Sequence, residues 1–143
     1  MRCTAARAGF TLIELMVVVL IVGILAAVAI GRYRGRVDSV RWSEGKVMMG
    51  TVATAMRAYA GEKGWNGANP TDIFGNGQTQ LGFEGGDLTG RFFADDDFQI
   101  DAVNINARPI TYTIRCTAGN GTEPPTTPSG YTLNQAGHFE AVP

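Results

Sequence analysis

Sixteen consecutive residues without a polar side chain run from Leu15 to Ile30 (LMVVVLIVGILAAVAI). Phe10–Ile13 extends this apolar run toward the N-terminus, with Thr11 and Glu14 as its only polar interruptions. As an α-helix, residues 10–30 would be about 32 Å long, close to the roughly 30 Å thickness of the hydrocarbon core of a bilayer. The run therefore predicts one membrane-spanning helix near the N-terminus.

The overall composition does not reveal this run. The chain has 143 residues, of which 45% are apolar and 17% charged, and its formal net charge is −1. These values fit one ordinary domain and give no support to a chain-wide nucleic-acid surface, which is normally basic. Two cysteines, Cys3 and Cys116, make neither a disulfide framework nor a metal cluster. The N-terminal segment therefore decides the class of protein.

Two ordinary interpretations of the apolar run are open. Arg2 and Arg7, together with the Ala27–Ala29 stretch (AVA), fit a secretory signal peptide. A plain membrane anchor is the second interpretation. Neither explains Glu14, because a carboxylate at this position costs free energy in a membrane. Glu14 is expected in the first helical turn, where it faces the positive end of the helix dipole, and a partner cation would give it a function.

The segment Gly9–Met16 (GFTLIELM) gives a more specific signal. A short basic leader that ends in Gly, followed by Phe-Thr-Leu-Ile-Glu at the start of a hydrophobic helix, resembles the processing site of type IV prepilins. The related pseudopilins of type II secretion share this site. The resemblance covers about the first thirty residues of the chain.

This resemblance implies that residues 1–9 are a leader peptide. A membrane-embedded prepilin peptidase would cut between Gly9 and Phe10 on the cytoplasmic side and would then N-methylate the new Phe10 amine. Glu14 would pair with the Phe10 ammonium of a neighbouring subunit, because an unpaired carboxylate is strongly disfavoured in a filament core of low dielectric constant. Glu14 and Phe10 would thus form an assembly salt bridge.

The resemblance also implies partners and a location. The partners are the prepilin peptidase/methyltransferase, further copies of this chain and other pilins, the inner-membrane assembly platform, and membrane lipid before assembly. The precursor would cross the inner membrane once. After assembly the chain would belong to a periplasmic or extracellular filament.

The sequence departs from the family pattern just after the apolar run. Members of the family commonly have a proline at the position of Gly31. Proline removes a hydrogen bond and kinks a helix, whereas glycine only weakens it, by about 1 kcal/mol relative to Ala. We therefore expect Gly23 and Gly31 to be weak points of a helix that has no fixed kink.

The helix is expected to continue beyond the apolar run with an amphipathic pattern. Apolar side chains recur at intervals near 3.6 residues, and Gly61 and Gly64 are stop signals. The sequence predicts one helix over Phe10–Ala60. Residues 10–31 are assigned to the membrane and filament-core part, and residues 32–64 to the amphipathic continuation with its stop signals. The residues expected on the packed face are Tyr33, Val37, Val40, Met48, Val52, Ala55 and Tyr59.

Four arginines follow the apolar run: Arg32, Arg34, Arg36 and Arg41. By the positive-inside rule alone they would place the C-terminal part in the cytoplasm, opposite to the orientation that the resemblance implies. We follow the more specific processing motif. The basic stripe could contact anionic headgroups or nucleic acid, but a solvated or intersubunit face is the simpler interpretation. Nucleic acid is therefore not an expected partner.

Residues 65–143 are expected to form a globular head. This region is rich in Gly, Thr, Asn and Asp and contains short alternating segments typical of strands. We predict three or four antiparallel strands that pack on the amphipathic half of the helix, which gives an α+β, pilin-like fold. The predicted strands are Asp97–Ile105, Ile110–Cys116, Tyr131–Leu133 and His138–Val142.

An acidic run in the head is a weak candidate for a metal site. Asp95, Asp96 and Asp97 could supply oxygen ligands for calcium, and some major pseudopilins bind calcium in this half of the chain. Their spacing does not match an EF-hand loop. An acidic turn is the simpler interpretation, and no metal or cofactor is assigned.

The remaining candidates for chemistry are isolated residues. Cys116 shares a strand face with Tyr112 and Ile114, so it is expected to be a small buried hydrophobe. Many type IV pilins have a C-terminal disulfide loop, which this sequence lacks because Cys3 would leave with the leader. His138 is the only histidine, and no nucleophile motif accompanies it. We therefore do not expect an enzyme.

The sequence thus predicts a structural subunit of a type IV pilus or pilus-like filament, polymerised through its N-terminal helix. The first alternative is a type II secretion pseudopilin, which shares the N-terminal motif. The second alternative is a membrane-anchored or secreted binding domain, in which the apolar run serves only as an address.

Overall fold

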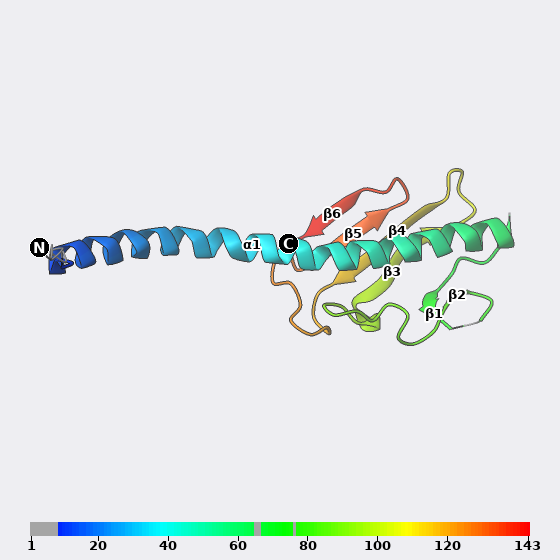
Figure 1. Ribbon diagram of the computed structural model, residues 1–143. Coiled ribbons are helices and arrows are strands. Elements are labelled where there is room, and N and C mark those ends of the chain that lie inside the picture. The colour runs from blue at the N-terminus through cyan, green and yellow to red at the C-terminus, as the bar shows by residue number, and fades with distance from the viewer. Residues whose placement is uncertain (1–8, 65–66, 76) are drawn as a thin grey trace, which may run out of the picture. The chain divides into compact units, whose positions relative to one another are not determined.

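A computed structural model describes residues 9–64, 67–75 and 77–143 (Figure 1). One long helix precedes a set of short strands, so the predicted α+β class is confirmed. Most of the predicted leader, Cys3 included, lies outside the described residues. The elements are α1 (Leu12–Lys63), β1 (Asp72–Phe74), β2 (Gln80–Phe83), the 3-10 helix η1 (Asp95–Asp97), β3 (Phe98–Asn104), β4 (Thr111–Thr117), β5 (Gly130–Asn134) and β6 (Phe139–Val142).

Helix α1 has 52 residues and ends slightly later than predicted, at Lys63 rather than Ala60. Gly64 follows it with a φ of 66°, in the left-handed region that glycine adopts without strain. The Gly64 N–H donates to the Ala60 carbonyl at 3.2 Å, which satisfies one of the last carbonyls of the helix. Of the two predicted stop signals, Gly64 is therefore the one that ends α1.

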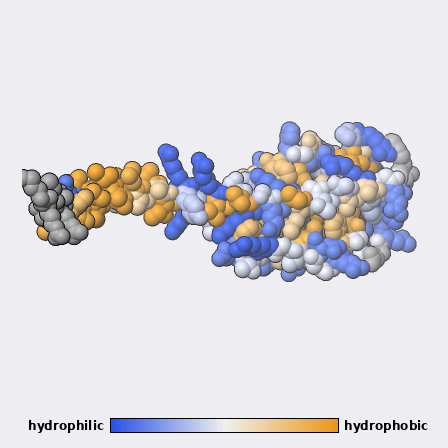
Figure 2. All heavy atoms as spheres, viewed as in Figure 1, coloured by the Kyte–Doolittle hydropathy of each residue, from blue (hydrophilic) through white to orange (hydrophobic). Residues whose placement is uncertain are grey.

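The chain divides into two compact units, one that ends at Arg36 and one that comprises Val37–Pro143. In the first unit, every described residue from Gly9 onward is exposed. Figure 2 shows hydrophobic side chains covering the N-terminal part of α1. A window of α1 with a mean hydropathy of 3.0 is long and apolar enough to cross a membrane, and none of it is buried. The described residues therefore contain one candidate membrane span, judged by length and composition.

The second unit is built on an antiparallel sheet in the order β3-β4-β5-β6. Each of these strands overlaps one of the four predicted segments, which confirms the prediction of a small antiparallel sheet. Ile114 of β4 lies opposite Ile100 of β3 and Leu133 of β5. Tyr112, Ile114 and Cys116 are buried at alternate positions. The sheet face predicted for β4 is therefore confirmed.

Two further strands, β1 and β2, were not predicted. They pair in parallel with a shift in register. Both are too short for alternation of apolar and polar residues to be recognised, and β2 has no β-branched residue. Ile73 of β1 nevertheless has an exposed fraction of only 1%, so this small pair contributes to the core.

The sheet covers the part of α1 that belongs to the second unit (Figure 1). The predicted packing face of this helix is wrong at its N-terminal end, where Tyr33 and Val40 have exposed fractions of 70% and 67%. A tryptophan and a carboxylate that the prediction left out are buried instead. The buried residues of α1 are Asp38, Trp42, Gly45, Met49, Val52, Ala53, Met56 and Tyr59, at the spacing expected for one helix face.

Aromatic rings fill the space between α1 and the sheet. The ring centroid of Trp42 lies 5.0 Å from that of Phe93 and 4.9 Å from that of Tyr131. Phe93 is fully buried, and a Cβ on Gly45 would come within 2.9 Å of its ring. The loop that carries Phe93 can therefore pack against α1 because residue 45 has no side chain.

Candidate functional site

The N-terminus of α1 is closed by reciprocal hydrogen bonds between Thr11 and Glu14. The Thr11 backbone N–H donates to Glu14 Oε2 at 2.9 Å, and the Glu14 backbone N–H donates to Thr11 Oγ1 at 3.3 Å. The Thr11 hydroxyl donates to the same Oε2 atom at 2.8 Å. This arrangement is a capping box, which satisfies N–H groups that a helix start leaves unpaired. The Thr-x-x-Glu pattern is the sequence signal from which the box could have been predicted.

Gly9 and Phe10 precede the helix, and both are exposed, Phe10 with an exposed fraction of 75%. No atom lies within 4 Å of the place where a Cβ on Gly9 would sit. The fold itself therefore does not require glycine at this position. The peptide bond between Gly9 and Phe10 is open to approach in the described part of the chain.

Glu14 lies in the first turn of α1, on a surface that is otherwise lined by Phe10, Ile13, Val17 and Val18. Its hydrogen-bond partners among the described residues are atoms of Thr11. In the uncut chain the Phe10 nitrogen is an amide nitrogen, so the ammonium required for the predicted pairing exists only after cleavage. The carboxylate is thus held at the helix start, where a cation from another chain could reach it.

Helix α1 continues without a break through Gly23 and Gly31, the two predicted weak points. No atom lies within 4 Å of a Cβ built on either glycine. Neither glycine is therefore needed for close packing within the chain. Their effect is on the intrinsic stability of the helix, which glycine lowers by about 1 kcal/mol per residue relative to Ala.

In the second unit, Asp38 of α1 anchors a distant loop. Its side chain is buried, and its Oδ2 atom accepts hydrogen bonds from the Thr126 hydroxyl at 2.7 Å and from the Thr127 N–H and hydroxyl at 3.2 Å each. Arg41 Nη1 lies 3.7 Å from the other carboxylate oxygen. The hydrogen bonds, that of the Thr126 side chain foremost, hold the pKa of Asp38 below its ordinary value although burial opposes this.

Arg41 extends the same anchor. Its guanidinium donates to the Pro124 carbonyl and to the Glu123 carboxylate, each at 3.4 Å. No disulfide among the described residues holds this loop, because their only cysteine, Cys116, is free. In the described part of the chain, polar contacts from α1 therefore hold the loop that carries Thr126.

Two of the three consecutive aspartates of η1, Asp95 and Asp97, accept hydrogen bonds from nearby turns. Asp95 accepts the backbone N–H of Leu88 at 3.0 Å, and the buried Asp97 accepts the side-chain amide of Asn120 at 2.9 Å. Asp96 is exposed. The described residues contain no group of three or more His, Cys, Asp or Glu side chains that could hold a metal ion. These contacts are those of an acidic turn.

Cys116 and His138 lie in different surroundings. Cys116 is fully buried, and burial, with a smaller effect of the nearby Asp97 charge, raises the pKa of its thiol. A buried thiol with a raised pKa is a poor nucleophile. His138 is exposed, and its backbone N–H donates to the Asn134 side chain at 3.1 Å.

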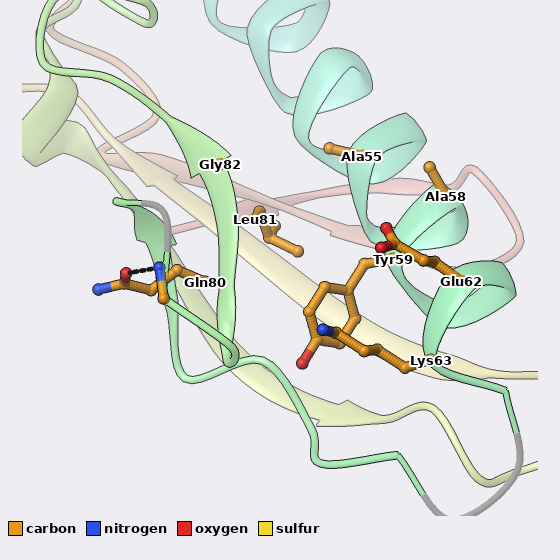
Figure 3. A pocket seen from close by; sticks show the side chains of 9 residues that line it. Ala55, Ala58, Tyr59, Glu62, Lys63, Gln80, Leu81 and Gly82 are labelled. Carbon is orange, nitrogen blue, oxygen red and sulfur yellow. Dashed lines mark hydrogen bonds between the residues drawn. The ribbon is translucent and has the colours of Figure 1, made fainter.

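A hollow of about 360 Å³ lies between the C-terminal end of α1 and β2 (Figure 3). The Tyr59 hydroxyl lies 2.7 Å from the carbonyl oxygen of Gln78, and burial raises its pKa. The described lining residues include Glu62 and Lys63 but no Ser, Cys or His. They therefore supply no nucleophile and base pair of the usual kinds. The lining residues are Ala55, Ala58, Tyr59, Glu62, Lys63, Gly77, Gln80, Leu81 and Gly82.

An exposed apolar helix that begins with a capped glutamate and continues into a small antiparallel unit has the α+β architecture of a pilin-like protein. The family described as "Prokaryotic N-terminal methylation motif" matches residues 4–30. The fimbrial protein EcpC of Eikenella corrodens is 45% identical over 56 residues, which are 39% of this chain and 37% of that protein.

Two further relatives are similar over comparable stretches. The type IV major fimbrial protein FimA of Dichelobacter nodosus is 43% identical over 72 residues, 45% of this chain and 46% of that protein. The type IV major pilin protein PilA of Myxococcus xanthus (strain DK1622) is 46% identical over 62 residues, 43% of this chain and 28% of that protein. The chain thus matches less than half the length of these curated relatives. No solved structure matches it.

The chain thus matches the N-terminal methylation motif and, over less than half of its length, is similar to type IV pilin and fimbrial proteins.

Proposed function

We propose that the chain is a structural subunit of a type IV pilus or pilus-like filament, made as a membrane-anchored precursor and polymerised through α1. The observation that carries this proposal is the capped Glu14 at the start of an exposed apolar helix, directly after an accessible Gly9–Phe10 bond. The relatives that are named as fimbrial and pilin proteins favour a pilus over a secretion pseudopilus.

In this proposal a prepilin peptidase removes residues 1–9 and methylates the Phe10 amine. Cleavage creates an ammonium group at Phe10, and the Glu14 carboxylate of a neighbouring copy forms an ion pair with it. Within a filament the apolar surface of α1 contacts helices of other copies in place of lipid. A carboxylate buried there without a cation would cost free energy, because an unpaired charge is disfavoured in apolar surroundings. Gly23 and Gly31 would let the helix adjust locally as copies pack, because glycine lowers the cost of local opening.

The mature N-terminus, measured by mass spectrometry on chain purified from cells that contain the peptidase, tests the processing step. We expect a chain that starts with N-methylated Phe10. A start at Ile30 would indicate signal-peptidase cleavage, and an intact Met1 would indicate a plain anchor; either result contradicts the proposal. We expect the matched variant Gly9→Val to remain as uncut precursor, because its leader no longer ends in glycine. Its second unit should fold normally, because the fold leaves space for a side chain at this position.

The pairing role of Glu14 can be separated from its capping role. In Glu14→Gln the amide oxygen can still accept the Thr11 N–H, but the negative charge is lost. We expect this variant to insert in the membrane and to yield few filaments, as counted by electron microscopy of sheared fractions. The control Thr11→Ala weakens the capping box but keeps the carboxylate, and it should assemble much better. Equal filament yields from Glu14→Gln and the unmodified chain would exclude the ionic pairing.

A further inference from the structure

Three arginines follow the apolar run at every second position: Arg32, Arg34 and Arg36. All three lie in α1 and are exposed. None of their side chains has an ion pair or hydrogen bond with another described residue. Arg41, in contrast, is paired with carboxylates of the second unit. The three arginines are thus a set of cations for which the described part of the chain supplies no anion.

The depth of these residues along the helix is fixed by its rise. At about 1.5 Å per residue, they lie roughly 3, 6 and 9 Å beyond Ile30, the last residue of the apolar run. The headgroup layer of a bilayer is roughly 5–8 Å thick on each side of the hydrocarbon core. A helix whose apolar run fills the core therefore carries the backbone of Arg32 and Arg34 within the headgroup layer and that of Arg36 at its outer edge, from which a long arginine side chain can reach back to the lipid phosphates.

The three arginines project from two opposite sides of the helix. At about 100° per residue, Arg32 and Arg36 project within about 40° of each other, whereas Arg34 projects on the opposite side. Tyr33 lies between them with an exposed fraction of 70%, and tyrosine is enriched at membrane interfaces. Figure 2 shows a hydrophilic band directly after the hydrophobic part of α1. Lipids on two opposite sides of the helix can therefore reach a guanidinium group.

We propose that Arg32, Arg34 and Arg36 form a collar that binds the phosphate groups of anionic phospholipids around the membrane-inserted precursor. Guanidinium groups are suited to this task because their planar donors bind phosphate oxygens in pairs. The collar positions the end of the apolar run at the membrane surface and must release its lipids when the chain leaves the bilayer. This proposal rests on the proposed function only in that the precursor spans a membrane.

The test uses the full-length chain in vesicles of phosphatidylcholine that contain phosphatidylglycerol as the minor lipid. Spin-labelled forms of both lipids report, by electron paramagnetic resonance, how strongly each associates with the protein. We expect phosphatidylglycerol to be preferred by about fivefold, the factor that corresponds to roughly 1 kcal/mol for one arginine near an anionic surface. In 1 M salt, where the Debye length is about 3 Å, the preference should fall toward one.

A charge-matched pair of variants makes the assignment specific. In Arg32→Gln/Arg34→Gln/Arg36→Gln the preference should disappear, whereas removal of three exposed arginines of the second unit should leave it unchanged. That control is Arg57→Gln/Arg91→Gln/Arg108→Gln.

Two outcomes would overturn the collar: a ratio near one for the unmodified chain, or equal ratios for the two variants. Resistance to alkaline extraction is measured in parallel to report insertion. A chain that fails to insert would contradict the proposed membrane precursor as well, whereas an inserted chain without the lipid preference would contradict only the collar.

Discussion

Asp38 shows how one buried carboxylate can organise a loop that lies more than eighty residues away in the sequence. It accepts three hydrogen bonds from Thr126 and Thr127 and lies next to Arg41. Removing the acceptor would leave the Thr127 N–H without its partner, and a buried unsatisfied donor costs about 1–3 kcal/mol. We therefore expect Asp38→Ala to lower the free energy of unfolding of the second unit by about 2 kcal/mol. Urea unfolding followed by the fluorescence of the buried Trp42 measures this change.

The same residue gives the stability a defined pH dependence. Because the pKa of Asp38 is lower in the folded than in the unfolded chain, its contribution is complete above the unfolded pKa of about 3.9 and is lost as the pH falls through the folded value. The stability difference between the unmodified chain and Asp38→Asn should therefore be constant near neutral pH and shrink below about pH 4. The control Glu123→Gln removes an exposed carboxylate that contacts Arg41. It should lower the free energy of unfolding by less than about 1 kcal/mol. A difference that grows in acid would contradict this role of Asp38.

In α1, two glycines five residues apart should respond oppositely to the same substitution. Gly45→Ala would place a Cβ 2.9 Å from the buried Phe93 ring, and overpacking of this kind costs about 1–3 kcal/mol. Gly50→Ala meets no atom within 4 Å and should stabilise the helix by up to about 1 kcal/mol. Thermal unfolding monitored by circular dichroism compares the two. Stabilisation by both variants would show that helix propensity, rather than the contact with Phe93, dominates at residue 45.

The packed face of α1 also shows where prediction from sequence stops. The spacing of apolar residues placed Val52 and Tyr59 correctly, because they lie in the middle of the packed segment. Tyr33 was misplaced because it belongs to the first unit, where α1 has no sheet to cover it. The burial of Asp38 depends on threonine hydroxyl groups that only the folded chain brings to it. Local periodicity carries no information about such distant partners.

The start of α1 is more predictable from sequence than the core, for a physical reason. Gly9, Phe10 and Glu14 are close in the sequence, and both the membrane-length run and the Thr-x-x-Glu cap are local patterns. The strands β3 to β6 were also found from local alternation, because each has a buried and an exposed face. What local patterns do not contain is the register between strands and the contact of Gly45 with Phe93, which joins residues 48 positions apart.

For the whole molecule, the division at Arg36 predicts that the second unit folds without the residues before Val37. Every described residue before Val37 is exposed, and the hydrophobic core consists of residues after this point. A chain that comprises Val37–Pro143 should therefore be soluble, unfold cooperatively, and have a melting temperature within a few degrees of that of the full chain in detergent, as measured by circular dichroism.

The matched control for this truncation begins at Ser43 and so lacks Asp38 and Trp42. Deletion of a buried tryptophan costs about 3–5 kcal/mol, and the anchor for the Thr126 loop is lost as well. Because small domains are stable by only about 5–15 kcal/mol, this shorter chain should be largely or wholly unfolded near room temperature. If the Val37–Pro143 chain were also unfolded, the apolar helix would contribute to the stability of the second unit, and the two units could not be treated as independent.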